Sequence, residues 1–387
     1  MNLDRTVQAF FYNNPDNYPP IINGARLLAE AGWRVELFCR DDGQEWKVEY
    51  PEAVRIERVK ATSGSSWRNY ISFCRQAMRR GKKGAAVFVG HDMHGLVPAR
   101  LLAARYGRPL IYHCYDYSGE GFTQTLGSRL VKSLQFGFAR SAGLMTVPDE
   151  GLANLLFKDL HLKRPPVVMV NSPLDQPRDG GALRGALQDR GRDYEKIVFR
   201  QGRIGRGHAL EVTIRSIPMW ANRKWGFVVM GIGESSYVDS LNKLAASLGV
   251  NDQFVALPPV AYDRVAKFTR DADLGHALYE PIHVNNLNIT GSCKIQEYMA
   301  AGLPLLVSDR PSLRSLVEEY SSGLTADDSR PESIAAAINA LLDNPEASHE
   351  MGVSSRRAFE LEFCYEKQFA PVIRAIEQLS NQLPGSL

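Results

Sequence analysis

Residues 273–311 read DLGHALYEPIHVNNLNITGSCKIQEYMAAGLPLLVSDRP, and this stretch decides the fold that the sequence predicts. It begins as a short apolar strand, passes through a polar loop at 280–293, and continues as a helix over about 294–301. Gly302 and Pro304 are typical helix-ending residues and precede a second apolar strand. A strand, a loop, a helix and a strand in this order are the repeating unit of a parallel sheet with helices on its faces.

The same alternation runs through the whole chain of 387 residues, in two blocks. The segment 171–192, rich in proline, glycine and charge, separates the blocks and is expected to link two domains. We predict two doubly wound α/β domains that face each other across a cleft, the default place for a ligand. The first is 1–172, with a C-terminal helix from 363–387 packing back on it, and the second is 173–362. The predicted strands are 7–12, 34–39, 85–89, 109–113, 143–147, 167–170, 196–200, 225–230, 253–256, 273–277 and 305–308, and the predicted helices include 21–31, 331–342 and 366–379.

The composition excludes several classes of protein. Hydrophobic residues make up 44% and charged residues 23% of the chain, which is ordinary for a globular protein and not for a disordered or collagenous one. No apolar run approaches the roughly 20 residues that span a bilayer, and the first residues lack the order of a secretory signal. The five cysteines are scattered without a CxxC pair, which is typical of reduced thiols in a cytosol and not of a disulfide framework or zinc ribbon.

Positive charge is concentrated in the first half of the chain. The formal net charge is only +3, which gives no case for nucleic acid as a partner. However, residues 1–172 hold 23 Lys and Arg against 16 Asp and Glu, whereas residues 173–387 hold 23 against 27. The first half is therefore expected to present a basic surface.

Much of this positive charge lies in the segment 55–83, which has nine basic residues and one acid. A predicted amphipathic helix starts near Trp67 and carries a basic row at Arg68, Arg75 and Arg79. Two interpretations are open. The row is either the solvated face of a helix that packs on the sheet, or a docking surface for an anionic acceptor or an anionic membrane.

A glycine-rich turn follows the first predicted strand of the second block. It reads GRIGRGH over residues 202–208 and leads into a helix. Glycines let a ligand approach the backbone, and a helix N-terminus offers N–H groups to an anion. Arg203 and Arg206 add two permanent cations that suit a phosphate. We interpret this turn, beginning at Gly202, as a diphosphate site; a tight turn with two solvated arginines is the alternative.

The polar loop and the helix after it carry the other candidates for ligand binding. Lys294, on the first turn of the helix, is unfavourable for the helix dipole, and a nearby anion would explain it. Glu297, one turn further, is placed to accept hydrogen bonds from vicinal hydroxyl groups, unless it is an ordinary surface carboxylate. The loop itself offers polar groups to a phosphate or a sugar. Its candidates are Asn286, Asn288, Thr290 and Ser292.

This stretch resembles the donor-binding signature of the retaining glycosyltransferases of family four, of the group 1 type, which have the GT-B fold. Their signature is a polar loop, a Pro-Asn-Lys or Pro-Ser-Lys triplet, and then Leu-Phe-Glu-Tyr-Met-Ala-Ala-Gly-x-Pro-Val. The resemblance covers most of the chain. It implies that Glu297 binds the nucleotide ribose, that the turn at 202–206 holds the diphosphate, and that the loop at 284–292 wraps the donor phosphate and sugar. The matching residues are Lys294, Glu297, Tyr298, Met299, Ala300, Ala301, Gly302 and Pro304.

The first half of the chain takes part in the resemblance as well. The segments 91–92 and 110–120 are similar to the family's strand and turn beside the cleft. Asp116, Glu280 or the donor's own phosphate is then left to take the proton of the acceptor, and the sequence does not choose among them. The residues expected on the cleft or acceptor side are His91, Asp92, His113 and Tyr115.

The chain departs from the family pattern in three places. Ser292 and Cys293 replace the Pro-Asn or Pro-Ser pair before the lysine, and Ile289 stands where many relatives have a second glutamate. Tyr115 and Asp116 stand where the family often has His-Asp or His-Glu. These departures leave the diphosphate and ribose assignments intact and affect the contacts with the donor sugar.

We therefore predict a glycosyltransferase of the hexosyltransferase type, as used in polysaccharide biosynthesis. It would move a sugar from a UDP- or GDP-linked donor to a glycan, a lipid-linked glycan or a small molecule, with retained configuration. Cationic side chains at the diphosphate make a metal unnecessary, so neither a metal nor a resident cofactor is expected. The expected location is the cytoplasm. If the segment 55–83 docks on a membrane, the protein would lie at its inner face. The alternatives are a nucleotide-sugar epimerase, a phosphorylase, and a sugar-nucleotide-binding protein without transfer activity.

Overall fold

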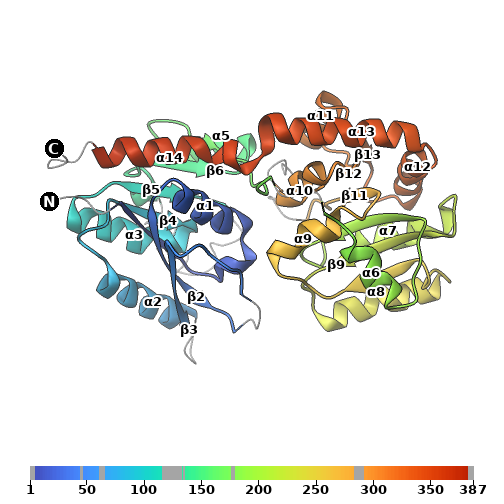
Figure 1. Ribbon diagram of the computed structural model, residues 1–387, viewed down its shortest axis with the longest axis horizontal. Coiled ribbons are helices and arrows are strands. Elements are labelled where there is room, and N and C mark those ends of the chain that lie inside the picture. The colour runs from blue at the N-terminus through green and yellow to red at the C-terminus, as the bar shows by residue number, and fades with distance from the viewer. Residues whose placement is uncertain are drawn as a thin grey trace. The chain divides into compact units, whose positions relative to one another are not determined.

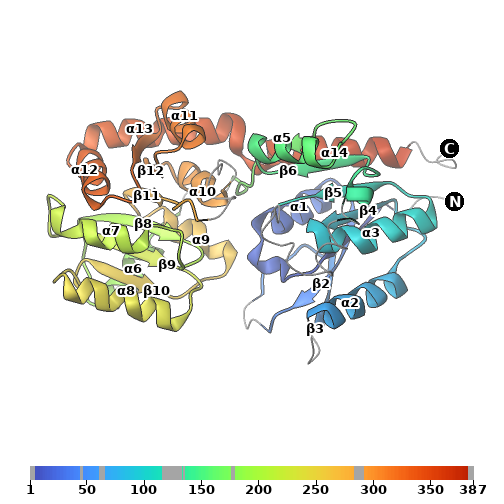
Figure 2. The ribbon, with the colours of Figure 1, turned by 180° about the vertical axis from the view of Figure 1, so that it is seen from behind.

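The computed structural model describes residues 5–43, 47–60, 66–115, 133, 136–175, 179–282 and 292–381 of the chain. The chain forms two compact units, of which unit 1 is Met1–Asn171 with Tyr365–Leu387 and unit 2 is Ser172–Cys364. Each unit is a parallel sheet with helices on both faces (Figures 1 and 2). The predicted fold class, two doubly wound α/β domains, is therefore confirmed.

Unit 1 contains a seven-stranded sheet in the order β3-β2-β1-β4-β5-β6-β7. Because the strand order reverses between β1 and β4, residues that follow these strands meet at one edge of the sheet. The strands are β1 (Thr6–Phe11), β2 (Arg34–Asp41), β3 (Val54–Lys60), β4 (Val87–His91), β5 (Leu110–His113), β6 (Leu144–Val147) and β7 (Val167–Val168). The helices are α1 (Pro19–Glu30), α2 (Ser66–Arg80), α3 (Asp92–Tyr106), α5 (Glu150–Asp159) and α14 (Tyr365–Asn381), with the short η1 (Pro15–Asn17).

Helix α14, at the C-terminal end of the described chain, packs in unit 1 against α1 (Figure 1). The hydroxyl group of Tyr365 donates a hydrogen bond to the carbonyl oxygen of Pro20 over 2.9 Å. The aromatic ring of Phe369 fills the space in front of Gly24, where a Cβ atom would lie 3.1 Å from it. Helices α1 and α14 thus cover one face of the sheet, and α2 and α3 pack on the other face.

Unit 2 contains a six-stranded sheet in the order β10-β9-β8-β11-β12-β13. Two separate apolar cores lie on its two faces, one under α6, α9, α10 and α11 and the other under α7, α8 and α12. The strands are β8 (Lys196–Gln201), β9 (Trp225–Met230), β10 (Phe254–Leu257), β11 (Leu274–Ala277), β12 (Leu305–Ser308) and β13 (Gly323–Ala326). The helices are α6 (Ala182–Gln188), α7 (Leu210–Ser216), α8 (Ser235–Ser247), α9 (Tyr262–Thr269), α10 (Cys293–Ala301), α11 (Pro311–Glu319), α12 (Pro331–Leu342) and α13 (Pro345–Ala358), with the short η3 (Ile217–Met219) and η5 (Phe359–Phe363).

Three elements differ from the sequence prediction. The strands β3 and β13 were not predicted, because both lie at sheet edges and are only partly buried, so their side chains carry little apolar signal. The predicted linker at 171–192 is wrong over 182–188, which forms α6. Leu183 and Leu187 stand one helical turn apart and are almost fully buried in the core of unit 2, and this pair holds the helix in place.

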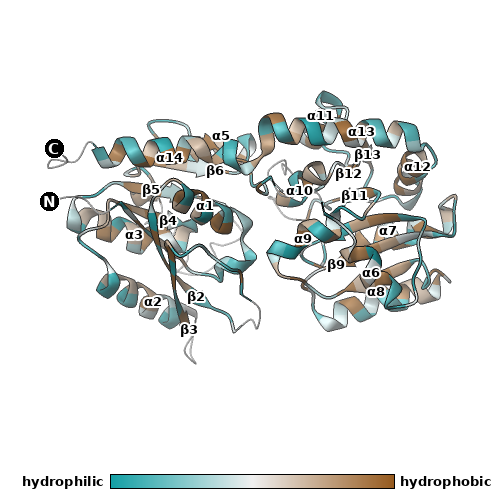
Figure 3. Ribbon diagram, in the orientation of Figure 1, coloured by the Kyte–Doolittle hydropathy of each residue, from teal (hydrophilic) through white to brown (hydrophobic). Residues whose placement is uncertain are grey.

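The strands of both sheets are mainly hydrophobic, whereas the helices carry polar residues on their outer faces (Figure 3). This is the pattern of a parallel sheet buried on both sides. In the described parts of the chain, no helix combines the length and the apolar character that crossing a bilayer requires.

Candidate functional site

Two glycines bring the ends of β8 and β9 into contact in unit 2. Gly202 directly follows β8 with φ +103°, and Gly231 directly follows β9 with φ +156°. A Cβ atom at Gly231 would overlap the carbonyl oxygen of Gly202, so no side chain fits there. The strand order of unit 2 reverses between β8 and β11, and doubly wound sheets bind their ligands at such a point.

Helix α10 places Lys294 at this glycine turn. The Nζ atom of Lys294 lies 3.1 Å from the position that a Cβ atom would take on Gly202. Arg203 and Arg206 extend from the same turn and are exposed. Within the described residues, none of these three cations has a carboxylate ion-pair partner. The structure therefore brings the predicted anion-binding residues together, and none of the three is held in an ion pair with a described carboxylate.

The nearby cations contribute to the pKa shifts of two neighbouring side chains. Burial lowers the pKa of His208 to about 2, and the cations Arg200, Lys294 and Arg203 contribute to the same shift. Burial alone would raise the pKa of Tyr279, but Lys294 and Arg200 outweigh it and hold that pKa below its usual value. The lowered pKa of Tyr279, which runs against the effect of its burial, indicates a positive potential that would also stabilise a bound anion.

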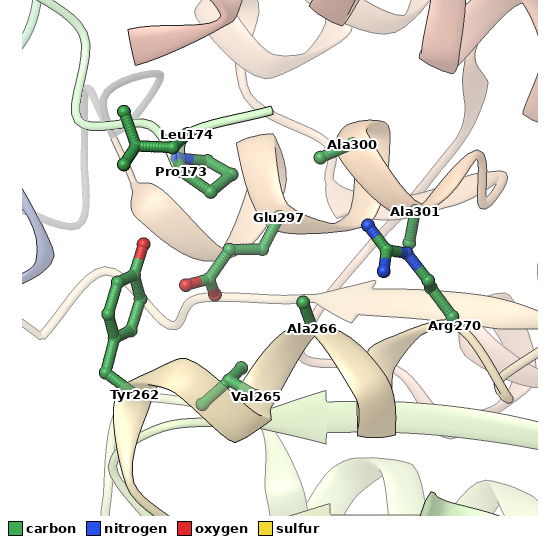
Figure 4. Close-up of a pocket in the computed structure, with 9 residues that line it drawn as sticks. All are labelled: Pro173, Leu174, Tyr262, Val265, Ala266, Arg270, Glu297, Ala300 and Ala301. Atoms are coloured by element: carbon green, nitrogen blue, oxygen red, sulfur yellow. The ribbon is translucent and has the colours of Figure 1, made fainter. Parts of the chain in front are cut away.

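Glu297 lies beside this turn, and its side chain lines a pocket. Its carboxylate accepts a hydrogen bond from the side chain of Gln201 over 2.9 Å and a weaker one from the thiol of Cys293 over 3.4 Å. Burial raises the pKa of Glu297. In Figure 4 its side chain points from α10 into the space between that helix and α9. The pocket is lined by Pro173, Leu174, Tyr262, Val265, Ala266, Arg270, Glu297, Ala300 and Ala301.

Glu280 has a structural task that the sequence did not indicate. Its Oε2 atom accepts hydrogen bonds from the backbone N–H groups of Gly207, over 3.1 Å, and Ala209, over 3.2 Å. Ala209 stands at the N-cap of α7, and its methyl side chain cannot accept a hydrogen bond that would cap the helix. The expectation that these N–H groups are free for an anion is therefore corrected, because a carboxylate of the chain itself already occupies two of them. The role of Glu280 in proton transfer stays a prediction.

The predicted acceptor-side residues of unit 1 meet at the ends of β4 and β5. The backbone N–H of Tyr115 donates to the carboxylate of Asp92 over 2.9 Å, and its hydroxyl group lies 3.0 Å from Nδ1 of His91. The rings of His91, His113 and Tyr115 stack, with centroids 5.2 to 6.3 Å apart. At 8%, 3% and 9% exposure they lie inside unit 1, so their contact with an acceptor stays a prediction.

Several predicted residues lie outside the described parts of the chain, namely Asp116, Asn286, Asn288 and Thr290. Ser292 is described and forms the N-cap of α10, with its Oγ atom 2.7 Å from the hydroxyl oxygen of Tyr279. Among the described residues, no group of three or more His, Cys, Asp or Glu side chains is placed to hold a metal ion.

Three residues of this site were not predicted from the sequence. Arg200 is a charged residue inside the apolar strand β8, and this mismatch was the one signal available. Tyr279 and Tyr262 carry no such signal, because a tyrosine after a strand or at a helix start is ordinary. Their places became visible only when the sheet brought β8, β11 and α9 together.

The buried histidines of unit 1 predict a loss of stability in acid. Burial lowers the pKa of His113 to about 4, against an ordinary 6.5, so the unfolded chain binds a proton that the folded chain does not. The free energy of unfolding should therefore fall by about 3 kcal/mol as the pH drops from 6.5 to 4. Urea unfolding across this range would measure the loss. His113→Asn should make the pH dependence less steep, although the buried His91 keeps its own lowered pKa, whereas His349→Asn, at an exposed histidine, should leave the dependence unchanged. An equally steep curve for His113→Asn would contradict the assignment.

Solved structures similar to the whole chain define the class of the protein. HepE of Anabaena, in complex with UDP and glucose, has a TM-score of 0.75 and 14% identity, covering 96% of this chain and 99% of its own. The sucrose-phosphate synthase of Thermosynechococcus elongatus has a TM-score of 0.73 and 14% identity, covering 97% and 98%. With its two Rossmann-like domains, the chain has the GT-B fold of these proteins.

The family follows from the sequence of each half. Residues 188–358 match the family model described as "Glycosyl transferases group 1". Residues 23–172 match the one described as "Glycosyl transferase 4-like domain". Both halves of the chain therefore match glycosyltransferase families, and residues 188–358 belong to the group 1 glycosyltransferases.

Curated relatives are similar over shorter or longer parts of the chain. The D-inositol 3-phosphate glycosyltransferase of Streptomyces avermitilis is 25% identical over 67% of this chain and 58% of its own length. That of Kineococcus radiotolerans is 28% identical over 87% and 84%. The alpha-D-kanosaminyltransferase of Streptomyces kanamyceticus is 27% identical over 45% and 43%. The chain thus spans less than two thirds of the first of these relatives.

Proposed function

We propose that the protein transfers a sugar from a nucleoside-diphosphate sugar, UDP- or GDP-linked, to an acceptor hydroxyl group with retained configuration and without a metal. This proposal rests on the position of Lys294, whose ammonium group lies beside the turn at Gly202 and close to the pocket that Glu297 lines. Three cations without counter-ions suit a diphosphate. HepE of Anabaena, which has a similar fold, is described in complex with UDP and glucose, and this supports the same class of donor.

The nucleoside part of such a donor would bind in this pocket. The carboxylate of Glu297 has acceptor capacity for two vicinal hydroxyl groups of a ribose. Tyr262 and Val265 offer an apolar wall on which a flat base would pack. When the bond to the sugar breaks, negative charge grows on the diphosphate, and Lys294 and the arginines of the turn would stabilise it.

The acceptor is proposed as a glycan, a lipid-linked glycan or a small molecule. By its name, the relative of Streptomyces avermitilis glycosylates an inositol phosphate, which supports a small hydroxyl-bearing molecule as one of these acceptors. Glu280 already accepts two backbone hydrogen bonds, which favours Asp116 or the donor's own phosphate as the group that takes the acceptor proton.

Calorimetry with nucleotides would test the donor site. We expect the wild type to bind UDP or GDP more tightly than the 2′-deoxy form, because Glu297 accepts from the ribose hydroxyls. Glu297→Gln should weaken binding roughly 10-fold and remove most of this preference. Glu350→Gln, at an exposed glutamate of α13, is the matched control and should bind like the wild type. If Glu297→Gln retains the full preference for ribose, the ribose assignment is wrong.

We further propose that α2 docks on an anionic membrane surface. Trp67 is 62% and Ile71 39% exposed, although both are apolar. Arg68, Arg75 and Arg79 are exposed on the same helix and have no carboxylate partner within the described residues. Exposed apolar residues beside unpaired cations are typical of helices that lie at a membrane interface.

Sedimentation with lipid vesicles would test this docking. We expect binding to vesicles that contain phosphatidylglycerol and little binding to pure phosphatidylcholine. Arg75→Glu with Arg79→Glu should lower the affinity by about 10-fold or more, since each basic residue near the surface contributes about 1 kcal/mol. Arg215→Glu with Arg330→Glu, at two exposed arginines of unit 2, is the matched control and should bind vesicles like the wild type. Equal binding to both kinds of vesicle would argue against an electrostatic docking face.

A further inference from the structure

A charged residue lies inside the core of unit 2. Arg200, near the end of β8, is only 2% exposed and is one of the largest fully buried side chains of the protein. It lies on the face of the sheet that packs against α7, next to Leu278. No carboxylate pairs with it in the described parts of the chain. A buried guanidinium without a counter-ion is costly, and its presence calls for a physical reason.

The contacts of Arg200 use only part of its hydrogen-bonding capacity. Its Nη1 group donates to the carbonyl oxygens of His276 and Leu278, each over 3.3 Å. Its Nε and Nη2 groups are buried and have no hydrogen-bond partner among the described residues. Pairing with a structural partner therefore does not explain why an arginine stands here, since buried donors are normally satisfied.

The neighbouring side chain of His276 adds no charge of its own. The hydroxyl group of Thr213 donates its proton to the carbonyl oxygen of Ala209 over 2.7 Å. Nε2 of His276, 2.9 Å from the same hydroxyl oxygen, must then be the donor in that contact. Nδ1 of His276 is consequently an acceptor and faces Nη1 of Arg200 at 3.4 Å. The imidazole is neutral, and Arg200 keeps its full positive charge.

The side chain of Tyr279 lies between Arg200 and the anion site. Its Cζ atom lies 5.1 Å from the ring centroid of Tyr279. The hydroxyl group of Tyr279 lies 2.7 Å from Oγ of Ser292, the N-cap of the helix that carries Lys294. His208, at the end of the glycine turn, packs edge-on against the same ring with centroids 5.8 Å apart. Tyr279 thus connects the buried guanidinium with both parts of the site.

We propose that Arg200 is a positioning residue of the donor site, a buried cation that holds Tyr279 in place and whose charge is balanced only when the diphosphate is bound. This inference rests on the proposed function, because it takes the diphosphate to lie at the turn of Gly202. The inference goes beyond the proposed function because it assigns a second layer of positive charge beneath the residues that touch the ligand. The unbound protein then carries an unfavourable charge whose cost is relieved on binding.

Two consequences follow, and they have opposite signs. Replacing a buried, unpaired charge with an apolar group of similar volume is commonly neutral or stabilising for the fold. Removing a cation several ångströms from a diphosphate in a poorly hydrated site weakens the binding of that ligand. A merely structural arginine would behave differently, since its loss would lower stability and leave the affinity of the folded protein unchanged.

The test is Arg200→Met in the full chain, with the melting temperature of the free protein and the dissociation constants for UDP, GDP and uridine. We expect a melting temperature at or above that of the wild type, and diphosphate binding on the order of 10-fold weaker. Binding of uridine, which has no phosphate, should not change. Arg223→Met removes an exposed arginine of unit 2 by the same substitution and should match the wild type in every measurement.

Two further variants keep the test decisive if Arg200→Met does not fold. Arg200→Gln keeps amide donors for the carbonyl oxygens but has no charge, and it should show the same loss of affinity. Arg200→Lys keeps the charge and should lie within about 3-fold of the wild type, since less than 1 kcal/mol is then at stake. Unchanged diphosphate affinity in Arg200→Gln would overturn the inference while leaving the proposed function in place. A wild type that binds no nucleoside diphosphate would overturn both.

Discussion

Lys294→Met is expected to weaken the binding of nucleoside diphosphates roughly 100-fold, because it removes one charge-assisted contact with a phosphate. The Nζ atom lies beside Gly202, and no carboxylate of the described residues competes for it. Transfer should fall at least as much as binding, since the diphosphate gains negative charge as it leaves. Calorimetry and turnover of the donor would measure the two effects.

Comparing the affinities for nucleoside diphosphates and monophosphates tests whether Lys294 contacts the second phosphate. The wild type should favour UDP over UMP, or GDP over GMP, and Lys294→Met should lose most of that preference. Lys243→Met, at an exposed lysine of α8, is the matched control and should bind like the wild type. If Lys294→Met lowers the affinity for mono- and diphosphates equally, Lys294 does not contact the second phosphate.

Gly231→Ala should disrupt the donor site through the backbone. The new Cβ atom would overlap the carbonyl oxygen of Gly202, and φ of +156° is a conformation that alanine rarely adopts. Because the neighbouring atom belongs to the main chain, the ends of β8 and β9 would have to move apart. We expect a loss of about 3 kcal/mol or more in the free energy of unfolding, together with loss of nucleotide binding. Thermal unfolding and calorimetry would show both.

A second glycine separates the clash from the effect of conformation. Gly249 also has a positive φ, +66°, but a Cβ atom there would meet nothing within 4 Å. Gly249→Ala should therefore cost only about 1 kcal/mol and leave nucleotide binding intact. If Gly231→Ala melts and binds like Gly249→Ala, the contact between the two strand ends does not shape the site.

The repeating pattern of apolar strands and helices predicted the fold well. Strands such as β9 and β12 have the predicted bounds, because short apolar runs between turn residues are unambiguous when a strand is buried on both faces. The edge strands β3 and β13 and the helix α6 were missed. Their apolar residues are few, and only the neighbouring strand or core shows that they are needed.

The residues of the site that belong to short local motifs could be predicted from the sequence. Gly202 and Lys294 were chosen from the glycine turn and the helix start, and they lie together although 92 positions separate them in the sequence. The use of Glu280 as a cap for the turn was not predictable, because the spacing of residues does not show which backbone N–H groups a loop carboxylate will meet.

The sequence by itself determined the alternation of elements, the family and the residue types that suit a phosphate and a ribose, since these depend on residues near one another in the chain. Only the tertiary structure decided how they act together. The reversal of strand order between β8 and β11 places a buried arginine, a tyrosine and a lysine from three distant segments around one turn. Electrostatic interaction depends on distance and burial in space, and neither can be read from the order of residues.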